Sequence, residues 1–162
     1  MSSLSQEAVE ALFDRVAHRY FALSLPNEPT SDQRLRHQKQ LDQFAREFIR
    51  IQRNLSDQSE QKFFALYFTG TIRFNQEKYQ AAYRWLTKAK QLYPEQAYIF
   101  MDMYAGCLHI LLSRKKRHAE ALETAYHYFH EGILAAKSNT DQETYQRLKE
   151  GYEYFFDKEC PF

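Results

Sequence analysis

Apolar residues recur at intervals of three and four along most of this 162-residue chain. That spacing places their side chains on one face of an α-helix. Polar turns or prolines separate the apolar segments. Glycine is scarce, whereas all-β chains with many tight turns are rich in it. We therefore predict an all-α chain of about seven helices. Six of them span about residues 4–24, 31–54, 58–75, 79–92, 96–113 and 118–136, and the seventh ends near Phe156.

Residues that cap helix N-termini stand before several of these segments. The expected caps are Thr30 with Gln33, Ser56–Asp57, and Asn139 or Thr140 with Glu143. Residues 33–40 are very polar, which predicts a solvated end of the second helix. Residues 160–162 follow the last apolar stripe and are expected to form a frayed tail.

The charges of the chain are nearly balanced, since 22 Lys and Arg face 21 Asp and Glu for a net charge of +1. Such a chain has no global field that would attract nucleic acid or an anionic membrane, so we expect neither as a partner. The two cysteines are too few for a disulfide framework or a zinc site. No signal peptide or apolar run of membrane-spanning length is evident, and we expect a cytoplasmic protein without a cofactor.

Three groups of residues are candidates for a catalytic thiol, a metal site and a phosphate-binding cluster. Cys107 and His109 lie two apart on a helix, where side chains diverge, and the thiol falls inside an apolar stripe. His127 and His130 share a helix face but lack a metalloenzyme motif, so we interpret them as a polar outer face. The basic residues 114–117 have no interleaved aromatic side chains and are interpreted as a solvated turn. We therefore expect no catalytic residue, no metal ligand and no enzyme activity.

Residues 63–96 cover most of the third predicted helix and all of the fourth. They carry a fixed pattern of small and aromatic positions closed by a proline. The positions are Gly70, Tyr79, Ala82, Leu86, Ala89 and Pro94. This segment resembles a tetratricopeptide repeat, a helix pair of about 34 residues. It departs from that pattern at Leu66, Thr69 and Arg73, and Glu77 replaces the glycine of the turn.

The resemblance implies an architecture for the rest of the chain. The fifth and sixth helices are similar to a second, degenerate repeat with Gly106 as its small residue, and the last helix is similar to a capping helix. The first two helices either cap the other end or begin a further degenerate repeat. The expected fold is a right-handed, superhelical stack of antiparallel helices in one domain, residues 1–162. Its parts are 1–55 (two long helices), 56–136 (repeat-like pairs) and 137–162 (capping helix and tail).

In tetratricopeptide stacks the first helix of each repeat lines a concave groove that holds a peptide. Carried over by register, the groove residues are Phe64, Tyr67, Phe68, Thr71, Phe74, Asn75, Tyr98, Met101, Asp102, Ala105, Leu108 and His109. The resemblance thus implies a non-catalytic adaptor or chaperone-like protein that binds an apolar or amphipathic segment of another protein. Two alternatives stay open: the peptide-sensing half of a regulatory protein, and a homodimeric scaffold. These rings also have a simpler interpretation, in which several of them pack against the long N-terminal helices.

Overall fold

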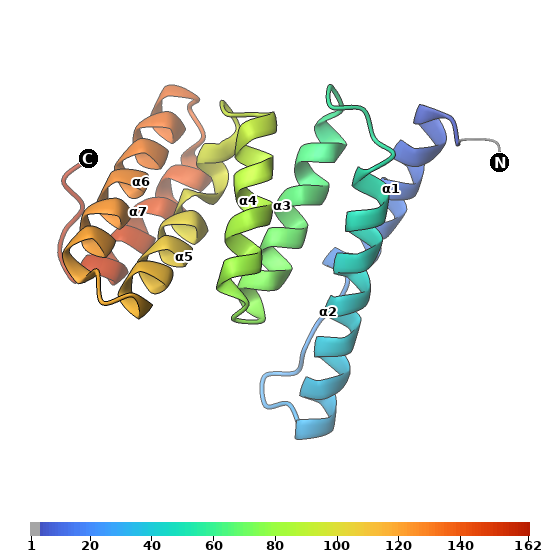
Figure 1. Ribbon diagram of the computed structural model, residues 1–162, viewed down its shortest axis with the longest axis horizontal. Coiled ribbons are helices and arrows are strands. Elements are labelled where there is room, and N and C mark those ends of the chain that lie inside the picture. Colours follow the sequence, from blue (N-terminus) through green and yellow to red (C-terminus); the bar gives the residue numbers. More distant parts are fainter. Residues whose placement is uncertain (1–3) are drawn as a thin grey trace. The chain divides into compact units, whose positions relative to one another are not determined.

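The computed structural model describes residues 4–162, and over that range it contains seven α-helices, one short 3₁₀ helix and no β-strand (Figure 1). The predicted all-α class is therefore confirmed. The chain forms two compact units, one ending at Lys78 and the other spanning Tyr79–Phe162, and each is described by itself. The prediction of a single domain is not tested by this division.

The first unit consists of α1 (Gln6–Phe21), α2 (Ser31–Gln52) and α3 (Glu60–Asn75). The long helix α2 packs against both of the others. The core they share is formed by apolar side chains from all three helices and from the α2–α3 connection: Val9, Phe13, Val16, Leu41, Phe44, Ala45, Phe48, Ile51, Leu55, Ala65 and Ile72. At the start of α2, by contrast, nearly every side chain from Ser31 to Gln40 is exposed, as its polar sequence predicts.

The helix starts in this unit show which capping predictions hold. At α2 the capping box is confirmed, because the Thr30 hydroxyl accepts from the Gln33 amide at 3.1 Å and the Gln33 side chain accepts from the Thr30 amide at 2.9 Å. The cap predicted at Ser56–Asp57 is wrong. Ser59 is the N-cap of α3 and makes no side-chain capping bond, while the Ser56 hydroxyl accepts from the Gln58 amide within the preceding turn.

The second unit consists of α4 (Tyr79–Leu92), the 3₁₀ helix η1 (Ala97–Phe100), α5 (Met101–Arg114), α6 (His118–Ser138) and α7 (Gln142–Phe156). Neighbouring helices in the sequence pack on one another, and α6 contacts α5 and α7 most extensively. Helix α6 approaches α5 closely at Gly132, where a Cβ atom would lie only 2.7 Å from the Cβ of Met101. Gly151 on α7 is less crowded, since a Cβ there would lie 3.3 Å from the Phe129 ring.

Three helices end with the same backbone motif, and none of them uses glycine. Glu77, Lys116 and Thr140 follow α3, α5 and α6 with φ angles of 60°, 60° and 51°. In each case the next amide donates to a carbonyl five residues earlier: Lys78 to Arg73, Arg117 to Leu112, and Asp141 to Ala136, at 2.9–3.0 Å. These are Schellman closures, which satisfy carbonyls that the helix leaves unpaired. Glu77, which replaces the expected turn glycine, is one of the three strained residues.

The last helix begins one residue later than its predicted caps allow. Thr140 belongs to the closure of α6, and its hydroxyl donates to the Asn139 carbonyl rather than accepting from α7. The N-cap is Asp141, whose carboxylate accepts from the Thr144 amide at 3.1 Å. The predicted pair of Thr140 with Glu143 is therefore wrong.

Residues 160–162 do not fray as expected, because Phe162 packs against side chains of α6 and α7. No helix in the described range 4–162 is both long and apolar enough to cross a membrane.

Candidate functional site

The groove residues predicted in the first unit divide into packed and accessible ones. Phe64 and Phe68 pack against the core of α1 and α2. The ring of Phe68 stacks with that of Phe13 (centroids 6.2 Å apart, 4° between planes) and meets Phe21 edge-on at 5.0 Å. These contacts agree with the simpler interpretation, in which the rings of α3 serve the N-terminal helices.

The other predicted residues of α3 are half-buried or exposed. Tyr67 and Phe74 are half-buried, and so is Thr71, whose hydroxyl donates to the Tyr67 carbonyl within the helix at 3.0 Å. Asn75, at the end of α3, is exposed. Asn75 also lines a cavity of the first unit.

In the second unit the predicted residues are occupied by internal contacts. Met101 and Ala105 are fully buried and belong to its core. The Tyr98 hydroxyl donates to the Asp141 carboxylate at 3.1 Å, and partial burial followed by that carboxylate raises the pKa of Tyr98. Asp102 forms an ion pair with Arg147 at 2.5 Å.

Leu108 and His109, the remaining pair, are half-buried. The His109 ring meets the Phe155 ring edge-on at 4.7 Å, and burial, with a smaller contribution from His118, lowers the pKa of this histidine. It is therefore an uncharged side chain at neutral pH, packed on an aromatic neighbour.

The structure reveals a cavity that the sequence did not predict, and we call it the α1–α2 cavity. It has a volume of about 460 Å³ and is lined by Tyr20, Phe21, Leu23, Leu25, His37, Gln38, Leu41 and Asn75. These residues come from the end of α1, the α1–α2 connection, the first half of α2 and the end of α3. The cavity lies where α1 ends at Phe21, and the proline-containing connection to α2 forms part of its wall through Leu23 and Leu25.

The walls of the α1–α2 cavity combine apolar and neutral polar groups. Phe21 and Leu25, two large apolar side chains that line the same cavity, are 67% and 39% exposed. Gln38 and Asn75 contribute amide groups. His37 also lines the cavity. Its Nδ1 atom is shielded from solvent and has no hydrogen-bond partner in the described structure. Burial raises the pKa of Tyr20, so its hydroxyl stays neutral.

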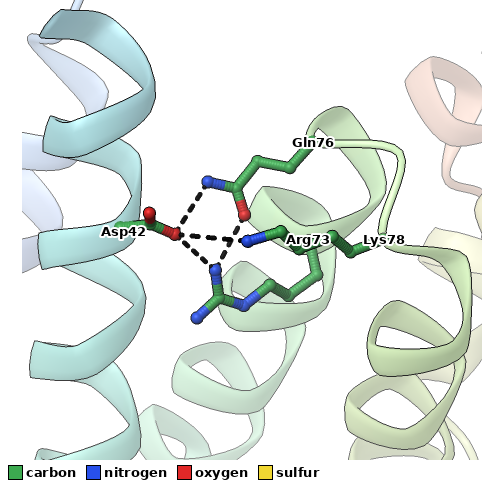
Figure 2. Close-up of polar contacts among 4 residues, drawn as sticks. All are labelled: Asp42, Arg73, Gln76 and Lys78. Carbon is green, nitrogen blue, oxygen red and sulfur yellow. Dashed lines mark hydrogen bonds and ion pairs between the residues drawn. The ribbon is translucent and has the colours of Figure 1, made fainter. Parts of the chain in front are cut away.

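A polar network lies directly beside the cavity and joins α2 to the end of α3 (Figure 2). The Asp42 carboxylate accepts from Arg73 Nη1 at 2.6 Å and from Gln76 Nε2 at 3.0 Å, and Lys78 Nζ lies 3.7 Å from the same oxygen. Arg73 also donates to the Gln76 side chain at 2.8 Å. Asp42 follows the cavity residue Leu41 in sequence, so this Asp42 network fixes α2 relative to α3 where both line the cavity.

The charge of Asp42 is stabilised by its partners. The hydrogen bond from Gln76 and then that from Arg73 lower the pKa of the Asp42 carboxyl, which is ionised at neutral pH. Arg73 occupies a position where the repeat pattern has an aromatic residue, and the structure shows the charge-assisted contact that the arginine makes there.

The residues considered for catalysis and metal binding are not brought together. Cys107 is buried, and desolvation raises the pKa of its thiol to about 12, so it is not a nucleophile at neutral pH. His127 lies 3.5 Å from Glu131 on an exposed face of α6, and His130 stacks on Phe162. No group of three or more potential metal ligands is found within residues 4–162.

Comparison with protein-family models, with curated proteins and with solved structures finds no match to this chain. The structure thus establishes the class of an all-α helical protein. The candidate binding site is the α1–α2 cavity, which has apolar and neutral polar walls, together with the neighbouring Asp42 network.

Proposed function

We propose that the chain is a non-catalytic binding protein whose α1–α2 cavity holds an apolar side chain from an extended or helical segment of another protein. The observation that carries this proposal is that two exposed apolar side chains, Phe21 and Leu25, line the same cavity of about 460 Å³. Contiguous exposed apolar side chains favour association, because binding removes their surface from water.

The lining of the cavity favours a peptide over a charged metabolite. Its polar groups are the amides of Gln38 and Asn75, the exposed part of the His37 ring and a neutral tyrosine. No Lys, Arg, Asp or Glu lines it. Neutral donors and acceptors around an apolar pocket match a peptide backbone flanking a buried apolar side chain.

This proposal retains the adaptor or chaperone-like role that the repeat resemblance implies and moves the binding site. The tetratricopeptide-like superhelix and its concave groove stay predictions. Two of the predicted groove residues, Phe64 and Phe68, support the cavity from behind by packing against α1 and α2. Asn75 belongs to both the predicted groove and the cavity.

The test is selection of a displayed peptide library on the full chain, followed by calorimetric titration of the enriched peptides. We expect enriched peptides to share a bulky apolar anchor and to lose at least about fivefold in affinity for Phe21→Ala or Leu25→Ala, a loss of about 1 kcal/mol that fewer than about a third of interface residues exceed. Tyr154→Ala is the matched control, since Tyr154 is a 93% exposed aromatic residue on α7 in the other unit.

Two results would contradict the proposal. Enriched peptides without an apolar anchor would show that the cavity does not select them. Equal loss in the Tyr154 variant would show that any exposed ring contributes. Light scattering of the free protein separates the homodimer alternative, in which the same surface would be covered by a second copy.

A further inference from the structure

Residues 158–162, which we call the tail segment, lie against the aromatic face of α6 and α7 in the second unit (Figure 1). The ring of Phe162 stacks on His130 with centroids 4.0 Å apart and 15° between the planes. It also meets Tyr126 at 5.5 Å and Tyr152 at 5.8 Å, both edge-on. The Tyr145 hydroxyl donates to the Phe162 carbonyl at 3.5 Å.

The tail segment reaches this surface through a backbone reversal. Asp157, which follows α7, has φ 51° and ψ 44°, so the chain leaves the helix axis there. Residues 159–162 have no regular secondary structure, and Pro161 biases the residue before it toward an extended backbone. A non-helical stretch therefore presents one aromatic side chain to a surface built by two helices, as a bound peptide does.

The contact is made in a way that permits release. The side chains of residues 157–159 are exposed, and the stacking partner His130 and Phe162 itself are only half-buried. Beneath them the Tyr152 hydroxyl is buried without a hydrogen-bond partner in the described structure. Cys160 lies close enough to contribute, after burial and Tyr126, to the raised pKa of Tyr152. A buried hydroxyl without a hydrogen-bond partner raises the free energy of the state in which the tail segment is bound. Displacement of the tail segment would lower that cost by letting water reach the hydroxyl.

We propose that Tyr126, His130, Tyr145 and Tyr152 form a second binding surface, specific for a non-helical segment that presents an aromatic side chain, and that the tail segment is its displaceable internal occupant. Intact protein then binds such a segment in trans only in the fraction of molecules whose tail segment has left the surface. The apparent dissociation constant is the intrinsic one divided by that fraction. The surface lies in the second unit, so this inference does not depend on the α1–α2 cavity.

The experiment titrates a fluorescent peptide of the tail sequence, KECPF, into the full chain under reducing conditions and measures its anisotropy. Phe162→Ala removes the internal occupant, so we expect this variant to bind the peptide at least about tenfold more tightly than the intact chain, for an open fraction of a tenth or less. A peptide with alanine in place of phenylalanine should not bind. Adding His130→Ala to the Phe162 variant should abolish binding, because it removes the stacking partner.

Three outcomes would overturn the proposal: equal affinity of the intact chain and the Phe162 variant, no binding by a Phe162 variant that keeps its helical circular dichroism, or unchanged binding after His130→Ala. Nuclear magnetic resonance of the intact chain gives a measurement that does not depend on the variants. A nuclear Overhauser contact between the His130 and Phe162 rings is expected, and it should weaken as excess peptide is added. Its absence, or its persistence at saturating peptide, would contradict the internal occupant.

Discussion

Two adjacent lysines after α5 provide a test of the Schellman closures. Lys115 has φ −89° and Lys116 has φ 60°, and both side chains are exposed. Replacing either by glycine removes the same charge and the same aliphatic chain at almost the same place. The two variants therefore differ mainly in the backbone angle at which the glycine is introduced.

The expected effects have opposite signs. A non-glycine residue in the left-handed region costs about 1–2 kcal/mol, and Lys116→Gly relieves that cost. Glycine also loses more conformational freedom on folding, which opposes this gain by about 0.5–1 kcal/mol. We expect Lys116→Gly to raise the free energy of unfolding by about 0.5–1 kcal/mol. Lys115→Gly gains nothing and should lower it by about 0.5–1 kcal/mol, so the two variants should differ by about 1–2 kcal/mol.

The assay is urea unfolding followed by circular dichroism and by the fluorescence of Trp85. This single tryptophan lies on α4, in the same unit as the two lysines, so its signal reports on the unit that is perturbed. Thr140→Gly repeats the test after α6, where φ is 51° and the native residue is β-branched. Equal effects of the two lysine substitutions, or destabilisation by Lys116→Gly, would refute the conclusion that these closures hold strained residues.

Three further predictions concern the core, the Asp42 network and the thiols. Gly132→Ala should destabilise the protein by about 1–3 kcal/mol through overpacking against α5. Gly151→Ala should be close to neutral, because the crowding there is milder and alanine favours a helix. Equal melting temperatures of the two variants would contradict the close approach at Gly132. Asp42→Asn should lower stability by no more than about 1 kcal/mol at pH 7, because the carboxylate is 37% exposed. The pKa of the Asp42 carboxyl is lowered from 3.8 in the folded state, so its contribution to stability is present above pH 3.8 and is lost as the pH falls through the folded-state pKa. A stability difference between Asp42→Asn and wild type that persists unchanged in stronger acid would count against the network. In native protein at pH 8 a thiol reagent should modify Cys160 far faster than Cys107, whose pKa is about 12, and equal rates would show that Cys107 is not buried.

Local sequence signals predicted the helices well, because they depend on residues close together in the chain. The capping box of Thr30 and Gln33 is an example, since both hydrogen bonds span three residues and need no tertiary contact. The cap expected at Thr140 failed for a physical reason. The amide of Asp141 closes α6, which holds Thr140 in the left-handed region and leaves Asp141 as the first residue able to cap α7.

Tertiary contacts were less predictable. The apolar character of Phe162 is visible in the sequence, but its partners come from α6 and α7, where Tyr152 lies ten residues and His130 thirty-two residues earlier in the chain. The α1–α2 cavity likewise joins three elements, and helical periodicity has no information on a non-helical connection. One usable signal was present, because Leu23 and Leu25 are apolar residues in a proline-containing break where polar residues would be expected.

The contacts of Phe68 explain why we place the proposed binding surface of the first unit at the cavity. A ring that packs against Phe13, Phe21 and Phe48 has most of its surface removed from water already, so a peptide would gain little by covering it. Four large apolar side chains among the described residues of this unit stay exposed, Leu4, Phe21, Leu25 and Leu35, and of these Phe21 and Leu25 line the α1–α2 cavity. Further burial there would remove water from two large side chains without unpacking the core. A partner that binds this unit at the α1–α2 cavity would therefore cover Phe21 and Leu25 together.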